Sequence, residues 1–202
     1  MTAEGNINVA PLPTIGFGSR APLWWGQVYM MCIEGTIFVI LVASYFFVRI
    51  GFTHWPPPSV IPPALGLPTF NILLLLASVI PMYLAGEAAL KGERGKVIVN
   101  MMLNIVMALG FLFIRLIEFN RFSFKWTTDI YGSFVWIIVG LHTMHAIADT
   151  VQSMVVLLIV LLKRVDEKQL LGIKIDGLYW YFVVGTWVPL YLLVYVYPNL
   201  QK

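Results

Sequence analysis

The residue with the clearest chemical potential in this chain is one acid inside an apolar run. Glu34 is the only charged residue between Leu23 and Val48, well inside both ends of that run. A helix rises about 1.5 Å per residue, so the carboxyl group would lie deep in a hydrocarbon layer about 30 Å thick. Acids at such depth usually face protein, carry a proton, or take part in proton or ion chemistry. Glu34 is therefore a candidate for proton exchange, and the alternative is a protonated acid that donates a hydrogen bond within the bundle.

Two polar residues share the expected helical face of Glu34. Gln27 lies seven residues before it and Tyr45 eleven residues after it. Both spacings return to nearly the same side of a helix. We expect Gln27, Glu34 and Tyr45 to form a polar stripe that faces protein.

The densest polar set follows in a later apolar run. His142, His145 and Asp149 are three and four residues apart, which projects all three from one helical face. Hydrogen bonds across a helix bundle are the favoured interpretation, and ligation of a metal or haem is the alternative. A catalytic metal needs about three convergent protein ligands, and the third histidine, His54, falls in a predicted loop. We therefore assign no catalytic, cofactor-binding or metal-binding residue to this chain.

A local ion pair is expected near the end of the third apolar run. Arg115 and Glu118 are three residues apart, a spacing that brings two side chains together on a helix. The single cysteine, Cys32, excludes a disulfide framework and a thiolate metal site.

The composition indicates the elements that must position these residues. The chain is 59% hydrophobic and 11% charged, whereas soluble domains carry about 25% charged residues. We predict an all-α polytopic membrane protein, a bundle of five transmembrane helices with no soluble domain. Residues 1–22 are expected to form an N-terminal segment, and residues 23–198 the transmembrane domain. The charged stretch 163–176 is expected on the membrane surface. The predicted helices are 23–50, 69–90, 97–119, 130–163 and 176–198.

The distribution of Lys and Arg predicts the orientation of the bundle. Eight basic residues fall on the side of the N-terminus and five on the other side. Because short cytoplasmic loops are enriched in basic residues, we expect the N-terminus in the cytoplasm and the C-terminus outside. The net charge of +3 arises from these loop residues, so no nucleic-acid partner is expected.

Several of these segments resemble one family when read in order. The stretch from Trp25 to Arg49 is similar to the opening helix of the five-helix form of subunit III of haem-copper terminal oxidases (the cytochrome c oxidase subunit III family), including its membrane glutamate at Glu34. The pair Glu118 and Phe119, the Tyr-Gly-Ser at 131–133 and the Gly-x-His-x-x-His at 140–145 resemble later motifs of that family. Similar positions in its last helix are Tyr179, Trp180, Phe182, Trp187 and Tyr191.

The resemblance implies a function and a set of partners. It implies an accessory subunit of a cytochrome c or quinol oxidase, without an active site of its own, in aerobic respiratory electron transport coupled to proton translocation. Haem and copper are then expected in partner subunits, and phospholipid is expected to bind this chain. Subunit I is the expected direct partner, followed by subunit II, and by subunit IV or a larger respiratory supercomplex. The expected location is the bacterial cytoplasmic membrane. In the family, the subunit is thought to sustain proton uptake and to protect subunit I.

The chain also departs from the family pattern. The last helix of the family reads Trp-His-Phe-x-Asp, whereas residues 180–184 read WYFVV, and Asp149 stands where glycine is common. We hypothesise that a buried acid has moved to the fourth helix, where Tyr181 or a histidine would satisfy Asp149. Two other classes stay open: a secondary transporter, and a membrane-embedded enzyme that uses His142, His145 and Asp149 with His54.

Overall fold

Five helical spans, each long and apolar enough to cross a membrane, make up the described chain. The computed structural model describes residues 21–58, 60–162 and 167–200, and it contains no strand in these ranges. The predicted all-α, five-span bundle is confirmed. The spans are α1 (Pro22–Ile50), α2 (Gly66–Ala77) with α3 (Val79–Leu90), α4 (Arg94–Arg121), α5 (Ile130–Leu162), and α6 (Glu167–Tyr191) continued by the π-helical turn η2 (Leu192–Val196) and by α7 (Tyr197–Leu200).

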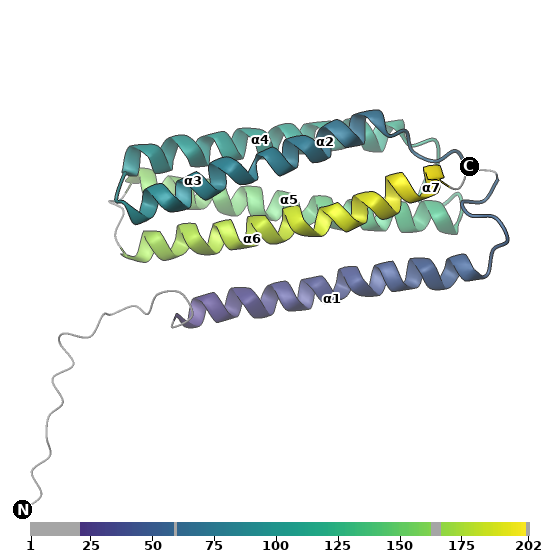
Figure 1. Ribbon diagram of the computed structural model, residues 1–202, viewed down its shortest axis with the longest axis horizontal. Coiled ribbons are helices and arrows are strands. Elements are labelled where there is room, and N and C mark those ends of the chain that lie inside the picture. Colours follow the sequence, from purple (N-terminus) through teal and green to yellow (C-terminus); the bar gives the residue numbers. More distant parts are fainter. Residues whose placement is uncertain (1–20, 59, 163–166, 201–202) are drawn as a thin grey trace, which may run out of the picture.

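The helix α1 lies along one side of the bundle formed by the other spans (Figure 1). It packs against α5 and α6, and only Phe38 and Tyr45 of its residues are buried. We call the end where α1, α4 and α6 begin the first end, and the end where α2 and α5 begin the second end. The first end is on the left of Figure 1. Because α1 touches the bundle with one face, polar groups on that face become buried against α5 and α6.

The second span is divided into two helices at Ser78, where we predicted one helix over 69–90. Pro81 has no backbone N–H to donate to the carbonyl group of Ala77, so the helical ladder is interrupted there. The Ser78 hydroxyl donates to the Leu75 carbonyl (2.6 Å) and accepts a hydrogen bond from the Trp180 indole nitrogen (3.0 Å). The break therefore also ties this span to α6.

The last span begins at Glu167, earlier than the predicted start at 176. Leu171, Ile173 and Ile175 are buried, so this part of α6 packs in the bundle and does not lie on a membrane surface. The prediction was wrong because Lys174 and Asp176 were counted as loop charges, although the adjacent Ile173 and Ile175 face the interior. The rest of the predicted surface stretch, 163–166, lies outside the described residues.

The start of α5 explains the Tyr-Gly-Ser motif structurally. The carboxylate of Asp129 accepts a hydrogen bond from the backbone N–H of Gly132 (2.6 Å), as a helix cap does. A Cβ atom on Gly132 would lie 2.8 Å from the carbonyl oxygen of Lys125. Only glycine fits there without a shift of the backbone, so this motif positions α5.

Candidate functional site

Glu34 reaches from α1 toward two polar side chains of neighbouring helices. The Tyr179 hydroxyl on α6 donates to Glu34 Oε2 (2.9 Å), and His145 Nε2 on α5 lies 3.7 Å from the same oxygen. The side chain of Glu34 is 21% exposed and that of His145 is 13% exposed. Glu34 therefore faces protein at membrane depth.

The hydrogen bond on the other side of the His145 ring determines where its proton lies. His145 Nδ1 is 2.7 Å from the carbonyl oxygen of Leu141. A carbonyl group only accepts, so Nδ1 carries a hydrogen, and the neutral ring presents the lone pair of Nε2 to Glu34. Glu34 and His145 can therefore hold one proton between them. The distance of 3.7 Å is too long for a direct hydrogen bond, so transfer needs a small movement or a bridging water.

His142 has different partners from His145. Its Nε2 donates to the carbonyl oxygen of Val183 (3.0 Å), and its ring packs 4.4 Å from that of Trp187. The Phe111 ring lies 6.1 Å away on another side, and no part of His142 is exposed. This arrangement favours a hydrogen bond across helices, and it separates His142 from the pair formed by Glu34 and His145.

Asp149 is fully buried, and neither of its carboxyl oxygens has a hydrogen-bond partner among the described residues. The hypothesis that Tyr181 or a histidine satisfies it was wrong. Tyr181 is 37% exposed and lies on the side of Gly177 that faces α3, and both histidines are engaged elsewhere.

The last helix also retains a buried acid, so the acid has not simply moved to α5. Asp176 is buried and accepts hydrogen bonds from Ser153 (2.8 Å) and Gln152 (3.2 Å). We missed this residue in the sequence because we placed Asp176 at the end of a loop. Tyr179 was noted only for its similarity to the last helix of the family, and its hydrogen bond to Glu34 was not predicted. Three apolar residues just before Asp176 could have indicated that the helix starts earlier.

The expected stripe of Gln27, Glu34 and Tyr45 does not form one connected group. The Tyr45 hydroxyl is buried toward the second end and accepts a hydrogen bond from the indole nitrogen of Trp55 (2.8 Å). Gln27 is half-buried, and its amide nitrogen has no partner in the described part of the chain. Of the three, only Glu34 meets the polar groups of α5 and α6.

A second polar cluster lies near the second end of the bundle. Arg115 Nη1 donates to Glu118 Oε2 (2.7 Å), and neither side chain is more than 2% exposed. Glu118 also accepts hydrogen bonds from Asn71 (2.9 Å) and Tyr195 (3.0 Å). The Arg115 guanidinium lies 4.0 Å from the centre of the Trp187 ring, a cation–π contact. The two charges therefore compensate each other inside the bundle.

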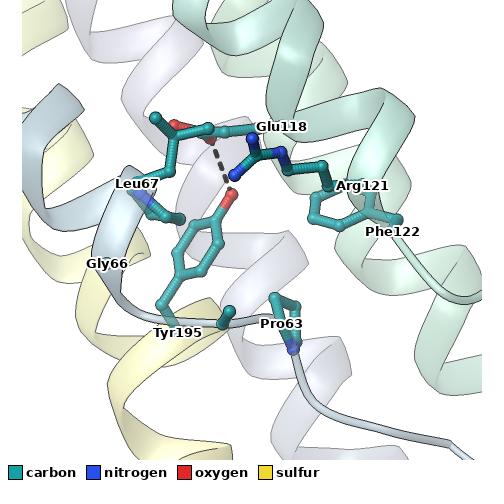
Figure 2. A pocket seen from close by; sticks show the side chains of 9 residues that line it. Pro63, Gly66, Leu67, Glu118, Arg121, Phe122 and Tyr195 are labelled. Atoms are coloured by element: carbon teal, nitrogen blue, oxygen red, sulfur yellow. Dashed lines mark hydrogen bonds between the residues drawn. The ribbon is translucent and has the colours of Figure 1, made fainter.

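A cavity of about 220 Å³ adjoins this ion pair (Figure 2). Figure 2 shows Glu118 and Tyr195 joined by their hydrogen bond, with Arg121 beside them and with Leu67 and Pro63 also lining the cavity. Glu118 and Tyr195 are hydrogen-bonded to each other, and most of the cavity lining is apolar.

The described residues offer no set of ligands for a metal. No three His, Cys, Asp or Glu side chains converge within residues 21–58, 60–162 or 169–200. Glu34 and His145 supply two groups, and a catalytic metal site normally has three protein ligands. The arrangement can bind and exchange protons, and it does not provide a metal centre in these ranges.

Comparison with known proteins gives a consistent family. The sequence profile described as "Cytochrome c oxidase subunit III" matches residues 16–199. The chain is 28% identical to "Cytochrome c oxidase subunit 3" of Schizophyllum commune over 177 residues, which cover 84% of this chain and 66% of that protein. It is 30% identical to the protein of the same description in Tachyglossus aculeatus aculeatus, over 70% of this chain and 54% of that protein.

The protein of the same description in Mus musculus is 27% identical over 95% of this chain and 74% of its own length. The chain thus spans about half to three quarters of the length of these relatives. The profile covers most of the chain, including Glu34, His142, His145, Asp149 and the pair Arg115 and Glu118. The chain belongs to the cytochrome c oxidase subunit III family.

Proposed function

We propose that this chain is an accessory subunit of a haem-copper terminal oxidase, and that Glu34 and His145 hold an exchangeable proton within it. The oxidase reduces oxygen and translocates protons, with haem and copper in other subunits. The observation that carries the proton role is that Glu34 Oε2 lies between the Tyr179 hydroxyl (2.9 Å) and His145 Nε2 (3.7 Å). An intramembrane acid with such partners is a functional candidate by default.

The direct partner in this proposal is subunit I, with subunit II in the same complex and subunit IV or a supercomplex beyond it. Large apolar side chains of α1 are exposed along most of its length, among them Ile33, Val39 and Phe47. Exposed apolar surface at this depth must meet lipid or another protein. In this proposal, proton exchange at Glu34 and His145 supports proton uptake by subunit I and protects subunit I from loss of activity during turnover.

Phospholipid is the second proposed ligand. A cavity of about 390 Å³ opens between α1 and α6, and its lining carries almost no polar group. An acyl chain suits this lining, because only apolar contacts are available there. The residues that line it include Gly35, Phe38, Val42, Thr186, Pro189 and Leu190.

The proposed location is a bacterial cytoplasmic membrane, with the first end of the bundle in the cytoplasm. Lys91, Arg94 and Lys96 gather at that end, which favours this orientation. Residues 1–22 would then lie in the cytoplasm and residues 23–198 in the membrane.

The test is to purify the tagged chain with its native partners, and to record the absorption spectrum and oxygen consumption of the preparation. We expect haem of the a or b type in larger subunits, together with oxygen reduction. The same purification from cells with an untagged chain is the control. A preparation without haem, in which this chain turns over a substrate of its own, would instead support a membrane-embedded enzyme.

A further inference from the structure

Asp149 is a buried titratable group that the proposed function does not yet use. Its side chain is fully buried on α5, and both carboxyl oxygens lack a hydrogen-bond partner among the described residues. Burying an unpaired carboxylate is strongly unfavourable, and the hydrocarbon region offers no bulk water to compensate it. Asp149 therefore needs a proton, an ordered water, or both.

Two other acids lie near Asp149, the buried Asp176 and the partly buried Glu34. Ser153 and Gln152, one helical turn further along α5, hold Asp176 at 2.8 and 3.2 Å. One helical turn in the other direction on the same face of α5, His145 lies against Glu34 of α1. Along α5, Asp149 thus lies between the residue that holds Asp176 and the residue that faces Glu34.

Asp176 lies closer to the first end than Asp149 and Glu34. At about 1.5 Å per residue, the last span is about 50 Å long and exceeds a hydrocarbon layer of about 30 Å by roughly 10 Å at each end. On the same scale Asp176 is about 13 Å from the start of α6, close to the membrane boundary at the first end. Asp149 is about 20 Å from the end of α5, and Glu34 is about 18 Å from the start of α1. Asp176 is thus the shallowest acid, and the half-buried Gln152 is its neighbour.

Toward the second end, the groups beyond His145 are held in contacts that belong to the fold. Beyond His145, His142 donates to the Val183 carbonyl and packs against the ring of Trp187. Behind that ring lies the fully buried guanidinium of Arg115. That guanidinium is paired with Glu118, whose oxygens already accept hydrogen bonds from Arg115, Asn71 and Tyr195 and so offer no free site for a proton. Any exchange with Glu34 inside this chain is therefore easier from the first end.

We propose that Asp176 and Asp149 form a proton relay that connects the first end of the bundle to Glu34. Asp149 gives its proton to Glu34 directly or through one ordered water, and is reprotonated from Asp176, which takes a proton from water near Gln152. One O–H bond breaks and one forms in each step, so the relay needs no other reactant. The relay rests on the proposed proton role of Glu34, and it identifies the residues that deliver protons to Glu34.

The test measures proton exchange at Glu34 in the intact, purified complex. The infrared bands of Glu34 are assigned by the difference between the wild type and Glu34→Gln, and their shift is followed after dilution into D2O. We expect Asp149→Asn to slow this shift about tenfold or more, which corresponds to about 1.4 kcal/mol of added barrier. Asp176→Asn is expected to slow it as well.

Thr150→Val is the matched control. Thr150 is buried beside Asp149, and its hydroxyl donates only to the Ala146 carbonyl of its own helix (2.7 Å). Its variant should exchange like the wild type. Exchange at the wild-type rate in Asp149→Asn, or equal slowing in Thr150→Val, would overturn the relay. If Asp149→Asn does not enter the complex, Asp176→Asn decides in the same way.

The two proposals fail differently in this experiment. A complex without haem, or without any infrared band that depends on Glu34, removes the proposed function itself. A complex that contains haem and shows the Glu34 band, but exchanges normally in the Asp149 and Asp176 variants, removes only the relay.

Discussion

The two polar clusters of this bundle bury charged groups in opposite ways. Near the second end, Glu118 accepts hydrogen bonds from Arg115, Asn71 and Tyr195 within 3.0 Å. Toward the first end, Glu34 has one hydrogen bond and a histidine at 3.7 Å, and Asp149 has no hydrogen-bond partner in the described residues. The first arrangement fixes its charges, whereas we propose that the acids of the second gain and lose protons.

This difference indicates which cluster serves the fold and which serves function. Separating a saturated buried ion pair leaves an uncompensated charge, so such a pair resists change. Acids with few partners give little stability, and their persistence at membrane depth needs another reason. We infer that the cluster of Arg115 and Glu118 holds α2, α4 and the end of the last span together, and that the acids near α1 exchange protons.

The largest effect is expected from breaking the saturated pair. Arg115→Leu should destabilise the chain by about 3 to 5 kcal/mol, because Glu118 would keep its charge without the guanidinium. The measurement is the melting temperature of the purified complex and the amount of this chain retained in it. Combining Arg115→Leu with Glu118→Gln should recover part of the loss. If Arg115→Leu melted at the wild-type temperature, the contrast between the two polar clusters would be wrong.

A smaller effect of opposite sign is expected at Asp149. Asp149→Leu removes two buried oxygens without partners and keeps a similar volume, so stability should stay unchanged or rise by about 1 to 3 kcal/mol. The same melting measurement applies, with Thr150→Val as the neighbouring control. Destabilisation as large as in Arg115→Leu would show that Asp149 has a structural role.

The sequence predicted the five spans well because long apolar runs separated by charges leave few alternatives in a membrane. It failed at the start of the last helix, because Lys174 and Asp176 look like loop residues when charge alone is counted. The break at Ser78 depends on Pro81, whose presence was visible, but the exact position of the break was not.

The candidate site could be predicted only in part. Glu34 and His145 could be singled out by residue type, since ionisable groups are rare in apolar helices. Three features depend on how α1, α5 and α6 are oriented about their axes. These are the pairing of Glu34 with His145, the hydrogen bond from Tyr179, and the lack of a partner for Asp149 in the described residues. Helical spacing within one helix does not contain that information.

The most direct test of the account is oxygen consumption by the complex that carries Glu34→Gln. Glutamine keeps the size of the side chain and can still accept the hydrogen bond of Tyr179, but it cannot exchange a carboxyl proton. The account predicts normal haem content and normal incorporation of this chain, with slower oxygen consumption or earlier loss of activity during turnover. A time course identical to that of the wild type, or failure of the chain to enter the complex, would contradict it.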